Sequence, residues 1–96
     1  MIELVVPDAL AEHAQLDDDR LSVAREMVGR QVFSFDGPLD DALALAESLS
    51  EESGGAPVLV NDVAKQTDET RIVDVYMHQD GRRMSVSEGA ERPVPD

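Results

Sequence analysis

The chain has no cysteine and no tryptophan, and it has one tyrosine and two phenylalanines. The absence of cysteine excludes a disulfide framework, a thiolate metal site and a cysteine nucleophile. Its longest unbroken apolar run, Ala42 to Ala46, is far too short to span a bilayer. The N-terminus also lacks the basic region that opens a signal peptide, since Glu3 stands there. We therefore expect a cytoplasmic protein with no membrane partner.

Lysine is nearly absent as well. The chain has one lysine, Lys65, and seven arginines, whereas Asp and Glu together number 21. The formal net charge is therefore −13 over 96 residues. Such a charge destabilises a compact state at low salt, but molar salt shortens the Debye length to about 3 Å. Dispersed acids, little lysine and an excess of Asp over Glu resemble the composition of halophile cytoplasmic proteins; the alternative is an ordinary acidic protein. Nucleic acid is not expected as a partner, because the surface repels phosphates and no aromatic stacking motif is present.

The N-terminal half predicts alternating strands and helices. Residues 2–6 are β-branched and apolar and end at a proline, which predicts a strand buried on both faces. Helices are predicted over 9–16 and from about 20 to 28, either as two helices or as one bent helix. A strand over 32–35 and a helix over 38–51 follow, with Asp and Gly before the proline that starts the helix.

The C-terminal half predicts a β-meander. Strands are expected over 57–63 and 71–79, and Asp80-Gly81 predicts a two-residue type I′ turn. This turn pairs Gln79 with Arg82, Met77 with Met84, Val75 with Val86, and Asp74 with Ser87. A four-residue loop at 66–69 would set Val60 opposite Val75 and Val58 opposite Met77.

These elements predict one α+β domain over residues 1–89. Short helices would pack on one face of a mostly antiparallel sheet. A parallel pair between 32–35 and 57–63 would make that sheet mixed. Residues 90–96, with two prolines and three charges, predict a flexible C-terminal tail.

The hairpin tip offers a candidate anion site. Arg82-Arg83 is the only adjacent basic pair, and His78 lies opposite Arg83 in the predicted register. These three residues could bind a phosphate or a carboxylate. The alternative is a charged edge that deters edge-to-edge aggregation.

A second candidate is a surface for self-association. In the predicted register one face of the sheet is strongly apolar and is covered by the helices. The opposite face still carries a patch of four apolar or aromatic side chains: Leu59, Val63, Ile72 and Tyr76. A patch of this kind, left uncovered on a small domain, predicts a homodimer.

No catalytic, metal or cofactor site is indicated. His13 and Asp17 have i, i+4 spacing, but two ligands make a weak metal site and no third is evident. Residues 17–19 are three acids without the alternating ligands of a calcium loop, and they fit a helix N-terminus better. No nucleophile elbow, phosphate-binding loop or dinucleotide fingerprint is present. No cofactor is therefore expected, and no reaction is indicated.

The sequence thus favours a small acidic interaction or regulatory module that acts as a homodimer; it does not indicate which protein, if any, is a further partner. The alternative is a small-ligand or anion-binding domain, enzymes included, that uses His78, Arg82 and Arg83.

Overall fold

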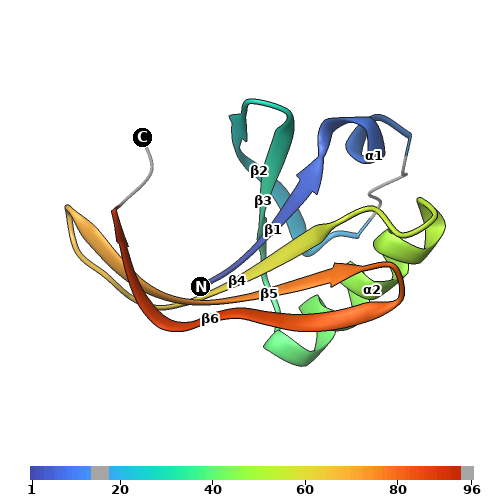
Figure 1. Ribbon diagram of the computed structural model, residues 1–96. Coiled ribbons are helices and arrows are strands. Elements are labelled where there is room, and N and C mark those ends of the chain that lie inside the picture. The colour runs from blue at the N-terminus through green and yellow to red at the C-terminus, as the bar shows by residue number, and fades with distance from the viewer. Residues whose placement is uncertain (14–17, 94–96) are drawn as a thin grey trace.

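The computed structural model describes residues 1–13 and 18–93, with only the backbone for residues 12 and 13. Within them the chain forms a six-stranded sheet, in which every pair is antiparallel, and two helices (Figure 1). The mixed α+β class is confirmed. The elements follow the order β1 (Ile2–Pro7), α1 (Asp8–His13), β2 (Leu21–Met27), β3 (Arg30–Phe35), α2 (Leu39–Glu52), β4 (Val58–Gln66), β5 (Thr70–Gln79) and β6 (Arg82–Pro93).

The strand order is β2-β3-β1-β4-β5-β6, with β1 and β4 at the centre. β1 pairs antiparallel with β3 on one side and with β4 on the other. The alternative of a parallel pair between 32–35 and 57–63 is not observed, because β1 lies between those two strands. The connection through α2 passes from β3 to β4 across β1.

The helix predicted from residue 20 to 28 is wrong: this segment is the edge strand β2, and it forms a hairpin with β3. Gly29, in the turn of this hairpin, has a φ of 78°. Val23 and Met27 are exposed, so the apolar spacing does not mark a core-facing stripe. The first helix, α1, spans Asp8–His13, and the rest of its predicted span, residues 14–16, lies outside the described residues.

The Asp80-Gly81 turn is confirmed, with φ values of 53° and 77°. Gln79 pairs with Arg82 and Met77 with Met84, as predicted. Beyond Met84 the pairing shifts at β-bulges, so the predicted pairing of Val75 with Val86 and of Asp74 with Ser87 is wrong. Val75 instead pairs with Ser87.

The predicted register between β4 and β5 is also wrong. Val60 pairs with Tyr76 and Val58 with His78. The turn closes one residue later than predicted, with Gln66 opposite Arg71, and a bulge after Val63 shifts the ladder again. A shift of one residue moves every side chain of the strand to the other face.

The sheet also includes the start of the predicted tail. Residues 90–93 belong to β6 and pair with β5, so the tail predicted from residue 90 is wrong for these four residues. Pro93 stands at the end of an edge strand, where its missing N–H does not interrupt the ladder. Residues 94–96 lie outside the described residues.

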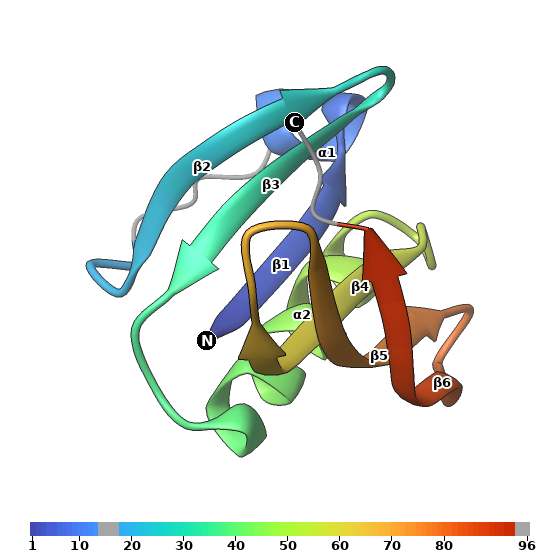
Figure 2. The same cartoon turned by 90° about the vertical axis from the view of Figure 1, so that its left-hand side faces the viewer.

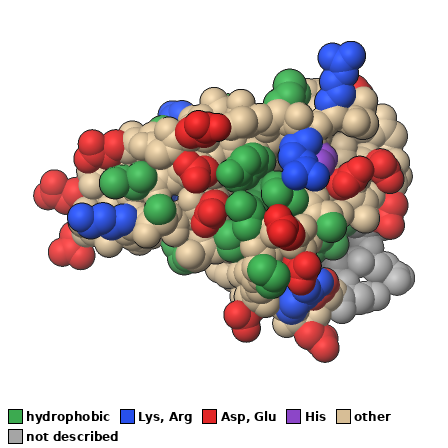
Figure 3. All heavy atoms as spheres, turned by 90° about the horizontal axis from the view of Figure 1, so that it is seen from below, with side chains coloured by type: hydrophobic (Ala, Val, Ile, Leu, Met, Phe, Trp, Pro, Cys, Tyr) green, Lys and Arg blue, Asp and Glu red, His purple; other side chains and the backbone are tan. Residues whose placement is uncertain are grey.

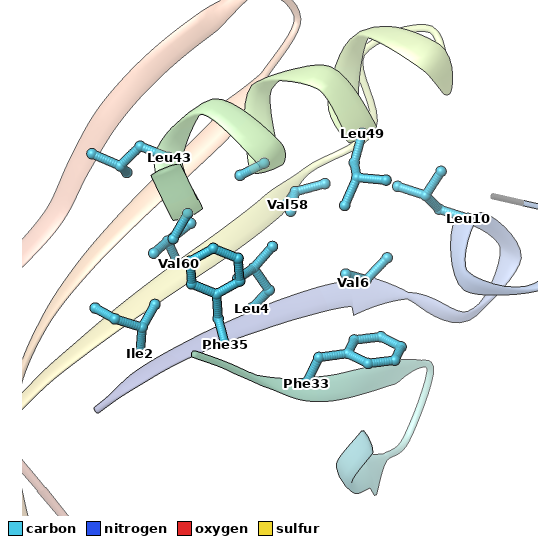
Figure 4. Close-up of a cluster of buried hydrophobic side chains, with 12 residues drawn as sticks. Ile2, Leu4, Val6, Leu10, Phe33, Phe35, Leu43, Leu49, Val58 and Val60 are labelled. Carbon is cyan, nitrogen blue, oxygen red and sulfur yellow. The ribbon is translucent and has the colours of Figure 1, made fainter. Parts of the chain in front are cut away.

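The hydrophobic core lies between α2 and the central strands. Leu49 of α2 and Leu10 of α1 point toward each other beside Val58 (Figure 4). Leu43 of α2 belongs to the same cluster, together with Leu4, Val6 and Val60. The two phenylalanines of β3 complete this cluster. Because side chains alternate along a strand, Glu3 and Val5 of β1 point to the opposite face. Both are buried there too, as predicted for a central strand.

That opposite face is curved. Figures 1 and 2 show the β2–β3 hairpin and the C-terminal end of β6 on either side of the central strands. A cavity lies between them, lined by residues from all six strands.

Candidate functional site

This cavity has a volume of about 380 Å³ and an apolar floor. Val5 of β1, Leu59 of β4 and Val73 and Val75 of β5 form much of its surface. Around this floor stand four arginines: Arg25, Arg30, Arg71 and Arg92. We call the cavity the arginine groove. It takes four of the seven arginines of the chain, and among the described residues no Asp or Glu lines it.

A buried carboxylate lies beside the groove and holds two of its arginines. Arg71 Nη1 donates to Glu3 Oε1 at 2.8 Å, and Arg25 Nη1 donates to Glu3 Oε2 at 2.9 Å. The amide of Asn61 adds a longer hydrogen bond to Glu3 Oε1, at 3.3 Å. The Glu3 side chain is 4% exposed and that of Arg71 is 9% exposed. Glu3 therefore fixes the position of both guanidinium groups.

The charge of Glu3 is stabilised despite its burial. Burial alone would raise the pKa of its carboxyl group, but the hydrogen bonds and positive charges of Arg25 and Arg71 outweigh that effect. The net result is a pKa below the ordinary value of 4.5. One ionised carboxylate thus faces two guanidinium groups.

The two guanidinium groups keep unused donors. Within the described residues, Nε of Arg25 and Nε of Arg71 are buried and have no hydrogen-bond partner. Buried polar groups are nearly always hydrogen-bonded in folded proteins. Planar guanidinium donors are suited to carboxylate and phosphate oxygens. In the described part of the chain, two guanidinium donors beside Glu3 are thus left without an acceptor.

A pair of like charges adds to this arrangement. Arg71 and Arg92 are direct partners across the β5–β6 ladder. Like charges at such positions are destabilising. An anion bound near both would relieve their repulsion.

The exposed Arg20, unlike Arg25 and Arg71, has an acidic partner on each of two sides. It donates to Asp18 and Asp41 at 2.8 and 3.0 Å and lies over the Phe35 ring. The hydrogen bonds from Arg20 lower the pKa of Asp18 to about 2. This arginine is neutralised by two acids, whereas Arg25 and Arg71 share one.

The anion site predicted from the sequence is only partly assembled. His78 does pair with Arg83, as predicted. Arg82 and Arg83 are neighbours on a strand, however, so their side chains leave the sheet on opposite faces. His78 is 4% exposed, whereas both arginines are exposed, and none of the three lines the arginine groove.

Burial determines the chemistry of His78. It lowers the pKa of the imidazole below 6.5, and the charge of Arg83 lowers it further, against smaller opposing effects of Glu47 and Glu51. Within the described residues, its Nε2 has no hydrogen-bond partner. The neutral imidazole favoured there does not add to the positive charge of the hairpin.

The four residues of the predicted dimer interface do not share a face. Leu59 lines the arginine groove, and Val63 is buried on the same side of the sheet. Tyr76 packs against the helix-side core, because the observed register places it on the other face. Ile72 is exposed near the β4–β5 turn. The patch that suggested a dimer is therefore divided, and self-association stays a prediction without it.

Among the described residues, no group of three His, Cys, Asp or Glu could hold a metal ion. The pair His13 and Asp17 falls outside the described side chains. In the same part of the chain, neither helix has the length and apolar character needed to cross a membrane.

The sequence does contain a signal for Glu3. It is a charged residue inside the apolar run of residues 2–6, and a charge in a doubly buried strand requires a partner. The partners themselves are not predictable, because Arg25 and Arg71 come from strands distant in the sequence, one of which was predicted as a helix.

No protein-family model matches the chain, and comparison with curated proteins and with solved structures finds no match.

Proposed function

We propose that this protein is a small-molecule-binding module that holds an anionic ligand in the arginine groove. In this proposal the helices cover one face of the sheet and leave the other for the ligand. The observation that supports it is the concentration of four arginines in a protein whose net charge is −13; among the described residues their only ion pairs are those of Arg25 and Arg71 with Glu3.

The four arginines of the groove contrast with the acidic surface of the rest of the protein. Acidic side chains are spread over the face seen in Figure 3. A groove lined by one sign of charge, with apolar walls, focuses the electrostatic potential and attracts the opposite charge. A volume of about 380 Å³ lies at the small end of the range for ligand pockets. We therefore expect a small ligand.

The test compares two arginines of the same strand. Arg92 lines the groove and Arg82 lies at the hairpin tip; both are exposed on β6, so neither substitution removes a buried side chain. Arg92→Gln and Arg82→Gln change the net charge equally. Binding of orthophosphate is measured by titration at one fixed KCl concentration. We expect Arg92→Gln to weaken binding about fivefold to tenfold, because it removes a charged hydrogen-bond donor, and Arg82→Gln to leave it unchanged.

A loss confined to Arg82→Gln would place the anion site at the hairpin and refute the groove. Equal, small losses in both variants would show that phosphate responds only to the overall charge, which would also refute it.

A further inference from the structure

The arginines are not evenly placed around the groove. Arg25 and Arg71 converge on Glu3, and Arg92 is the cross-strand partner of Arg71. Arg30 lies toward the other end of β1, opposite Pro7. One end of the groove therefore carries three guanidinium groups.

The floor beyond that end is apolar. Val5 follows Glu3 on the same face of β1, and its ladder partner on β4 is Leu59. Val75 continues this surface on β5. Two exposed apolar side chains stand at the rims: Met27 at 46% exposed on β2 and Val86 at 52% exposed on β6.

We infer that the ligand is amphipathic, with one oxyanion head bound by Arg25, Arg71 and Arg92 and an apolar body lying over Val5, Leu59 and Val75. This inference rests on the proposed function and adds the chemical class of its ligand. The head accepts hydrogen bonds from the guanidinium donors that Glu3 leaves free. The body covers the apolar surface of Leu59 and Val75 that is still partly open to water.

The head is a phosphate monoester or a carboxylate, since both present the oxygens that guanidinium groups bind. The apolar body is short, because the cavity is small. Rim residues such as Val86 contact the body and leave the head untouched.

The experiment measures affinity for a series of probes at one fixed KCl concentration: orthophosphate, methyl phosphate, butyl phosphate and pentanoate. We expect affinity to rise about twofold to fourfold for each methylene group from methyl to butyl phosphate, which is the effect of burying a methylene in full or in part. Butyl phosphate and pentanoate carry bodies of similar size, so the tighter of the two identifies the head group.

A matched pair of variants locates the body. Val86→Ser removes an apolar side chain of the groove rim, whereas Val23→Ser removes one that is 65% exposed on β2 and lies outside the groove lining. We expect Val86→Ser to reduce the advantage of butyl phosphate over orthophosphate at least twofold and to leave orthophosphate binding unchanged. Val23→Ser should change neither.

Equal affinity for orthophosphate and butyl phosphate would overturn the inference and leave the proposed function intact. A chain-length effect that Arg92→Gln and Val86→Ser both leave unchanged would place the body elsewhere, and would overturn it as well. Absence of binding by all four probes would contradict the proposed function itself.

Discussion

Glu3 provides the sharpest prediction about stability. The substitution Glu3→Gln keeps the size of the side chain and removes the charge that both Arg25 and Arg71 face. Arg71 then holds a positive charge in a site where its side chain is only 9% exposed. Breaking a buried ion pair by removing one partner costs about 3–5 kcal/mol. Arg25 is more exposed and regains some hydration, so the lower end of that range applies, about 3 kcal/mol.

This loss is large for a domain of this size. The free energy of unfolding of a small domain is about 5–15 kcal/mol. A loss of about 3 kcal/mol from it lowers the melting temperature by about 10–20 °C. The assay is urea unfolding in molar KCl. The control is Glu69→Gln, an exposed acid near the β4–β5 turn, which removes the same charge and should change stability by less than about 0.5 kcal/mol.

The double variant Glu3→Gln/Arg71→Met tests whether the unpaired charge of Arg71 causes the loss of stability. It removes the charge of Glu3 and that of Arg71 together, so its loss of stability should be smaller than the sum of the losses of the two single variants. Equal stability of Glu3→Gln and Glu69→Gln would refute the reasoning, because it would show that the buried carboxylate does not hold the two arginines.

Four further predictions follow from the structure and the composition. The melting temperature should rise steeply from low to molar KCl, because salt screens the net charge of −13; a flat profile would contradict the halophile interpretation. Gly81→Val should destabilise the protein by about 1–3 kcal/mol in urea unfolding, because Gly81 has a φ of 77°, and an unchanged midpoint would exclude this cause. The folded-state pKa of His78 is lowered, so the neutral imidazole stabilises the fold above pH 6.5. This stabilisation declines as the pH falls from 6.5 toward the folded-state pKa. The free energy of unfolding of His78→Leu, measured across this pH range, should lack that decline. Tyr76→Asp should destabilise the protein rather than merely separate a dimer, because Tyr76 packs on the core; sedimentation and unfolding measured together distinguish these outcomes.

Local signals in the sequence were sufficient for several elements. The strand 2–6, the helix starting after Pro38 and the Asp80-Gly81 turn each depend on residues close together in the chain, and all three are present. The segment 20–28 was misassigned because Leu21, Ala24 and Val28 have helical spacing. Pairing with β3 overrides that weak preference.

The groove could not be predicted, because it depends on register. A bulge after Val63 and others near Val75 shift the ladders, and each shift exchanges the two faces of a strand. The predicted register joined Leu59 and Tyr76 in one patch, whereas the observed register separates them. It also brings Arg71 beside Glu3, a contact between β5 and β1 that no local pattern encodes.

The most direct test of the central claim is to map where an anion binds. Amide proton–nitrogen correlation spectra are recorded while butyl phosphate is added at constant KCl. We expect the largest shifts at groove positions on β5 and β1, including Arg71, Val73 and Val5, and little change at Arg82 and Arg83. Shifts centred on Arg82 and Arg83, with the groove amides unmoved, would contradict the account.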